Sequence, residues 1–109
     1  DATIMRTPGI LYQERGSDSV SNLYNIKLIN KTVKPQEIFI RLKDGDGNVE
    51  IIGKPYIAVE KEGLGSGSFF VVLPKSRIHN RKTEIKMDLY SNDRLITSLE
   101  TNFLGPADH

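Results

Sequence analysis

The chain has 109 residues and no cysteine, and its 15 lysines and arginines nearly balance its 14 aspartates and glutamates. This length predicts one domain, and the lack of cysteine excludes disulfides, iron–sulfur clusters and cysteine nucleophiles within the chain. The net charge of +1 predicts no nucleic-acid partner, and no apolar run approaches the roughly 20 residues that span a bilayer, so we expect no membrane insertion.

Short runs of alternating apolar and polar residues recur along the chain, separated by Gly, Pro, Asn and Asp. A first strand is predicted over residues 4–13, with a break at Pro8-Gly9. Because proline cannot donate to a ladder, the break indicates either an edge strand or a bulge, and in immunoglobulin-like folds edge strands often switch sheets at such a break. After a turn at residues 16–19, a second strand is predicted over residues 20–30, with Tyr24 on its buried face.

The middle of the chain predicts a third strand over residues 37–43. Phe39 and Arg41 share its outer face, where the arginine stem would cover the ring. Residues 44–48 are dense in Gly, Asp and Asn and predict a hairpin turn. Two short strands are expected over residues 49–52 and 56–59.

The last part of the chain begins with a glycine-rich stretch, residues 63–67, that predicts a flexible loop. Residues 68–73 are almost continuously apolar and predict a central strand covered on both faces. Three further segments complete the prediction: a basic hairpin loop over residues 75–82, a strand over 84–90 with Ile85, Met87 and Leu89 inward, and a final strand over 94–103 with Leu95, Leu99 and Phe103 inward.

These segments amount to about seven principal strands and a minor one. The sequence therefore predicts an all-β, antiparallel β-sandwich of immunoglobulin or fibronectin-III type, as one domain over residues 1–109. Because the first residue is not methionine, we expect a fragment of a longer protein.

Three segments resemble a known family: residues 6–13, residues 21–32, and the closing Phe103-Leu104-Gly105-Pro106. They are similar to the C-terminal immunoglobulin-like domain of the FixG/CcoG family, membrane-bound iron–sulfur proteins that are accessory to assembly of the cbb-type cytochrome c oxidase. The resemblance covers nearly the whole chain.

The resemblance implies that the parent protein carries four-iron–four-sulfur clusters and moves electrons in support of copper handling. This domain would follow the last membrane helix, on the periplasmic face of the bacterial inner membrane. It would itself be non-catalytic and without a cofactor. Its implied role is contact with proteins: oxidase subunits, a copper chaperone or its own copy.

No catalytic, cofactor-binding or metal site is assigned from the residues. Residues 44–50 are similar to the start of a calcium loop, but the sixth and twelfth positions hold Val49 and Pro55 where an EF-hand needs Gly and Glu. His79 remains a candidate copper ligand, because histidine and methionine bind copper. It would need Met5 and perhaps His109 close by.

The loop over residues 75–82 contains four cations, Lys75, Arg77, Arg81 and Lys82. It is either a solvated loop or a contact surface for an acidic partner or lipid headgroups.

Three residues are candidates for structural roles. Tyr24 or Tyr12 could bury its ring while its hydroxyl reaches a backbone group. The sequence Asn30-Lys31-Thr32 matches a glycosylation sequon, but Asn30 and Thr32 more simply close the turn after the second strand.

Two other functions remain open. A secreted adhesion or carbohydrate-binding module would need an exposed aromatic pair, such as Phe39 and Tyr90. A direct copper-binding domain would need the three ligand candidates to converge.

Overall fold

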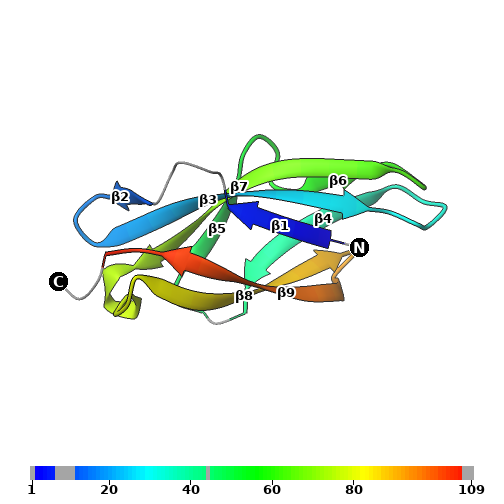
Figure 1. The fold of residues 1–109 in the computed structure, drawn as a ribbon. Helices are drawn as coiled ribbons and strands as arrows, with labels where there is room; N and C mark the ends of the chain where they lie inside the picture. Colours follow the sequence, from blue (N-terminus) through cyan, green and yellow to red (C-terminus); the bar gives the residue numbers. More distant parts are fainter. Residues whose placement is uncertain (1, 7–11, 44, 107–109) are drawn as a thin grey trace.

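The computed structural model describes residues 2–6, 12–43 and 45–106. Within these residues the chain forms two antiparallel sheets packed face to face, which confirms the predicted all-β sandwich (Figure 1). The strands are β1 (Ala2–Arg6), β2 (Gln13–Arg15), β3 (Ser19–Ile29), β4 (Gln36–Leu42), β5 (Asn48–Ile51), β6 (Ile57–Val59), β7 (Leu64–Pro74), β8 (Lys82–Ser91) and β9 (Arg94–Leu104), with one 3-10 turn, η1 (Lys75–Arg77).

The first sheet has the strand order β1-β3-β7-β5, and β2 also pairs with β3. β1 pairs with β3 from Ala2↔Leu28 onward, and β2 pairs with it from Gln13↔Ser21 onward. The expected edge position is therefore correct, but the expected switch between sheets is wrong, because both parts pair with the same strand. The break predicted at Pro8-Gly9 lies outside the described residues.

The second sheet has the order β6-β4-β8-β9. Because β4 pairs with β6 and β8 while β5 pairs with β7, the turn after β4 joins the two sheets, and the predicted hairpin is wrong. Gly47 is needed in this turn, since a Cβ there would lie 2.6 Å from Leu73 Cδ2. The segment that is similar to the start of a calcium loop is thus the connection from β4 in one sheet to β5 in the other. Its first residue, Asp44, lies outside the described residues.

The glycine-rich stretch is not a loop, because Leu64 already begins β7. A Cβ on Gly65 would lie 2.7 Å from Val59 Cγ2, and one on Gly67 would lie 2.9 Å from Ile57 Cγ1. The glycines therefore let β6 of the other sheet approach β7 closely. β7 is central, as predicted, but its outer face is only half-buried, with the Arg15 guanidinium 4.8 Å from the Phe70 ring centre.

The core lies between the sheets and includes the predicted inward side chains of β3 and β8. In β9, Phe103 is buried and Leu99 is half-buried, but Leu95 is 56% exposed. The cause is a bulge: Leu89 pairs with Thr97 while Tyr90 pairs with Leu95, so Ile96 is an extra residue. The bulge turns Leu95 out of the core toward solvent, so that prediction is wrong.

The basic loop also joins the two sheets, since β7 and β8 lie in different ones, so it is no hairpin. Ile78 anchors the loop, because its side chain is only 1% exposed. It packs closely against Gly105, where an added Cβ would lie 2.8 Å from Ile78 Cγ2. The predicted turn between β8 and β9 is confirmed, with Asn92 and Asp93 both at positive φ.

Candidate interaction surfaces

Tyr24 joins the two sheets at the C-terminal end of β9. Its side chain is fully buried, its ring stacks on Phe69 with centroids 5.5 Å apart, and its hydroxyl donates to the carbonyl of Asn102 at 2.8 Å. Tyr12, the other candidate, is half-buried and packs against the core.

Asn22 makes a second link that sequence reasoning missed. Its Nδ2 donates to the Leu104 carbonyl at 2.7 Å, and the Leu104 N–H donates to its Oδ1 at 2.8 Å. The signal in the sequence was a polar residue on the apolar face of β3, in line with Val20 and Tyr24. Such a residue must find partners when it is buried.

Asn30 holds together the turns that follow β3 and β6. Its amide donates to the carbonyls of Lys34 at 2.8 Å and Glu60 at 3.0 Å, and its carbonyl oxygen accepts from the Thr32 N–H at 2.9 Å. With its side chain used in this way, Asn30 is 7% exposed. The triplet Asn30-Lys31-Thr32, which matches a glycosylation sequon, thus lies in a turn that the Asn30 side chain closes by hydrogen bonds.

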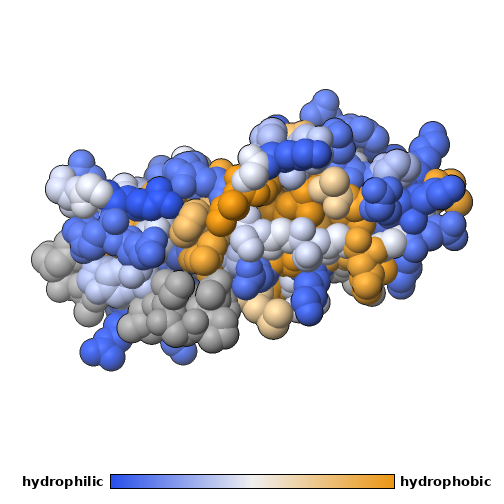
Figure 2. All heavy atoms as spheres, turned by 90° about the horizontal axis from the view of Figure 1, so that it is seen from above, coloured by the Kyte–Doolittle hydropathy of each residue, from blue (hydrophilic) through white to orange (hydrophobic). Residues whose placement is uncertain are grey.

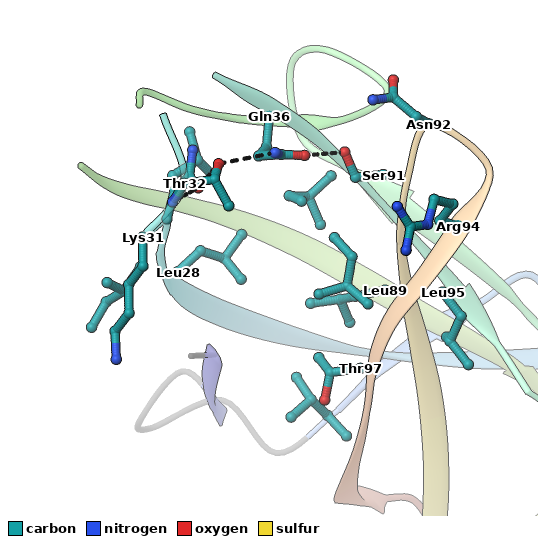
Figure 3. Close-up of a pocket in the computed structure, with 16 residues that line it drawn as sticks. Leu28, Lys31, Thr32, Gln36, Leu89, Ser91, Asn92, Arg94, Leu95 and Thr97 are labelled. Carbon is teal, nitrogen blue, oxygen red and sulfur yellow. Dashed lines mark hydrogen bonds between the residues drawn. The ribbon is translucent and has the colours of Figure 1, made fainter. Parts of the chain in front are cut away.

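A groove of about 920 Å³ opens between the sheets where β3 ends and β9 begins (Figure 3). The buried side chains of Leu28 and Leu89 contribute to its lining. The exposed part of its wall is apolar: Ile29, Leu95 and Ile96 are 45%, 56% and 53% exposed. The sequence did not predict this groove, because its lining comes from segments that are distant along the chain.

Polar side chains border the groove. Ser91 Oγ donates to Gln36 Oε1, and Gln36 Nε2 donates to Thr32 Oγ1 at 3.2 Å. These bonds link the end of β8 and the start of β4 to the turn after β3. Lys31 and Arg94 lie on opposite sides in Figure 3. The described residues that line the groove include these two cations and no carboxylate.

β9 forms the edge of its sheet beside this groove. Leu104 directs its N–H and its C=O away from β8, toward Asn22. Since backbone groups in an antiparallel strand alternate between the two edges, Ser98 and Glu100 also direct theirs away from β8. Within the described part of the chain, no strand pairs with this edge.

The outer face of the second sheet carries an aromatic row. Phe39 pairs with Tyr90, which pairs with Leu95, and the Phe39 ring lies 5.7 Å from that of Tyr56. The Arg41 guanidinium lies over Tyr90, 5.2 Å from the ring centre, rather than over Phe39 as predicted. Phe39 is 36% exposed on this face.

The four cations of the basic loop lie at the opposite end of the molecule from the groove. Pro74, just before the loop, pairs with the start of β3, whereas Leu64, opposite the groove, pairs with its end. Lys75 Nζ is 3.0 Å from Glu14 Oε2. Arg77 is half-buried, and Arg81 and Lys82 are exposed. The loop is thus available for contact, and its partner role stays a prediction.

The candidate copper ligands are spread over different elements. His79 is exposed in the basic loop, Met5 is 49% exposed on β1, and Met87 is fully buried on β8. Within residues 2–6, 12–43 and 45–106, no group of three or more His, Cys, Asp or Glu could hold a metal ion. His109 lies outside the described residues.

Apolar side chains also reach the surface elsewhere. Figure 2 shows hydrophobic atoms exposed over the middle and the right-hand part of the face seen from above, among hydrophilic ones. Two apolar side chains in the described part of the chain, Val33 and Leu64, are 73% and 77% exposed. In the part of the chain that the structure describes, no helix has the length and apolar character needed to cross a membrane.

The chain is similar to a known protein family over almost its whole length. Residues 1–106 match the family model described as "IG-like fold at C-terminal of FixG, putative oxidoreductase". The predicted immunoglobulin-like fold is thereby confirmed. No curated protein matches the chain.

Two solved structures are similar. The crystal structure of a FixG-related protein from Vibrio parahaemolyticus is 26% identical with a TM-score of 0.68, covering 95% of this chain and 94% of that one. The crystal structure of a protein from Archaeoglobus fulgidus is 11% identical with a TM-score of 0.49, covering 97% of this chain and 96% of that one.

Proposed function

Because the chain belongs to the family of immunoglobulin-like domains found at the C-terminus of FixG, we propose that it is the non-catalytic interaction domain of a FixG/CcoG-like oxidoreductase. The parent carries the four-iron–four-sulfur clusters, and it supports assembly of the cbb-type cytochrome c oxidase and copper handling. This domain contributes binding to proteins, with oxidase subunits, a copper chaperone or a second copy as candidates.

The observation that carries the proposal is that the buried polar side chains bond within the fold, while the surface keeps features that suit binding to another protein. Buried polar groups such as Asn22, Tyr24 and Asn30 are used to hold the sandwich together. The features left at the surface are a groove with apolar walls, an open strand edge and an aromatic row. These are features through which proteins bind other proteins.

Deletion tests the proposal. Cells that carry the parent protein without residues 1–106 should retain its iron–sulfur absorbance but assemble less cbb-type oxidase, measured by oxidase activity and haem staining of isolated membranes. A parent whose clusters are lost on deletion, or a normal level of oxidase, would contradict an interaction role in oxidase assembly.

Location is tested separately. We propose that the domain lies on the periplasmic face of the inner membrane. Alkaline phosphatase fused after His109 in the parent should then be active, and green fluorescent protein fused at the same point should be dark. The reverse pattern would place the domain on the cytoplasmic side.

A second candidate function has an observation in its favour. Phe39, Tyr90 and Tyr56 form a partly exposed aromatic surface of the kind that a carbohydrate-binding module would need. Sugar rings would have to displace Arg41 from the Tyr90 ring. A glycan array probed with the chain and with a Phe39→Ala, Tyr90→Ala variant would detect this function, and we expect no glycan whose binding depends on the two rings.

Direct copper binding is checked by calorimetric titration of the chain with Cu(I) and Cu(II). We expect no saturable site. One-site binding that disappears in His79→Ala would instead make the domain a copper-handling module.

A further inference from the structure

We propose that the groove and the open edge of β9 together bind an extended, acidic and apolar peptide as an added β-strand. The proposal rests on the interaction role proposed above and specifies the surface and the chemistry of the partner. The peptide pairs with the stretch of β9 that begins at Arg94 and ends at Glu100, and directs alternate apolar side chains into the groove.

The first argument is the backbone. Ser98 and Glu100 each direct an N–H and a C=O away from β8, their side chains are exposed, and no strand of the described residues pairs with β9 on that side. Further along β9, Tyr24 and Asn22 already occupy the outward groups of Asn102 and Leu104. The open stretch is therefore bounded, and its seven residues extend over roughly 20 Å, enough for a short peptide strand.

The second argument is the apolar wall beside this edge. Ile29, Leu95 and Ile96 are each about half-exposed and line the groove with the core residues Leu28 and Leu89. Open strand edges next to apolar side chains are sites where another chain adds a strand, with ladder hydrogen bonds giving affinity and side-chain pockets giving specificity.

The third argument is charge. The chain as a whole is nearly neutral, yet the described residues that line the groove include two cations and no carboxylate. Arg94 is exposed at the start of β9, where its guanidinium can reach a carboxylate on the added strand. The occupant that complements this surface carries an acidic side chain at the end of the strand nearest Arg94.

The test is selection of peptides on the 109-residue chain from a random twelve-residue phage library. Enriched peptides are synthesised, and their affinity is measured by fluorescence anisotropy. We expect them to contain an acidic residue followed or preceded by alternating apolar residues, and to shift the NMR amide signals of residues 28–32 and 94–100.

Two variants test the two contacts. Ser98→Pro removes an outward N–H without removing a bond to β8, and should weaken binding tenfold or more. Its control is Ser98→Ala, which removes only the hydroxyl that donates to Asp88, and should change binding less than twofold. Arg94→Glu should also weaken binding at least tenfold, while Arg81→Glu, an exposed cation at the far end, should not.

The following outcomes overturn the proposal. No peptide is enriched, or the enriched peptides bind Ser98→Pro as well as the unchanged chain. Binding that is lost in Arg81→Glu would place the contact at the basic loop, which leaves the interaction role intact and removes the groove. Sedimentation that shows a dimer lost in Ser98→Pro would assign the edge to a second copy of the chain.

Discussion

At the scale of single residues, this sandwich depends on a few side chains that cross between its parts. Tyr24 and Asn22 on β3 bind backbone groups of β9 in the other sheet, which are about 80 positions later in the chain. Each fills a role that a disulfide fills in many small sandwiches, and this chain has no cysteine. The sequence shows the buried position of these residues, but their partners depend on the fold.

Tyr24→Phe tests this link. It keeps the ring on Phe69 but leaves the Asn102 carbonyl without its donor, so we expect a loss of about 1–2 kcal/mol in the free energy of unfolding, measured by urea denaturation. Tyr90→Phe, at a half-exposed position, is the control and should change stability little. Equal losses in the two variants would remove the assigned role of the Tyr24 hydroxyl.

Asn30→Ala tests the turn that Asn30 organises. The carbonyls of Lys34 and Glu60 and the N–H of Thr32 would each lose a partner, and we expect a loss of about 2–3 kcal/mol. The exposed Asn80→Ala should be neutral by comparison. Denaturation midpoints that coincide for the two variants would show that the turn holds without the amide.

At the scale of elements, local pattern predicted the strands that have one buried face. β3, β4 and β8 alternate with period two, and their inward residues are those expected from the sequence. The pattern failed where a neighbour from the other sheet decides the structure. Gly65 lies in a strand because Val59 packs over it, and Leu95 faces outward because Ile96 forms a bulge.

Gly65→Ala tests the close approach of β6 and β7. The new Cβ would lie 2.7 Å from Val59 Cγ2 and 2.9 Å from the Ala58 carbonyl oxygen, so we expect destabilisation of about 2 kcal/mol. Gly45→Ala is a matched control, because a Cβ there meets nothing within 4 Å. Thermal unfolding should separate the two variants; an unchanged melting temperature for Gly65→Ala would mean that β6 can retreat without cost.

At the scale of the whole molecule, the two ends differ in chemistry. One end has the groove, with apolar walls, an open strand edge and Arg94, and β1 starts beside it because Ala2 pairs with Leu28. The other end has the basic loop. The basic loop is one continuous segment that the sequence already shows, whereas the groove could not be predicted because it gathers residues from several elements.

The central claim is that the domain binds proteins, and site-specific photo-crosslinking in cells tests it most directly. A photoreactive phenylalanine analogue is placed in the parent protein at Ile96 in the groove, at Arg81 in the basic loop, or at the exposed control position Lys27 on β3. The account predicts protein adducts from Ile96 well above those from Lys27. Background labelling at all three positions would contradict an interaction role for this domain.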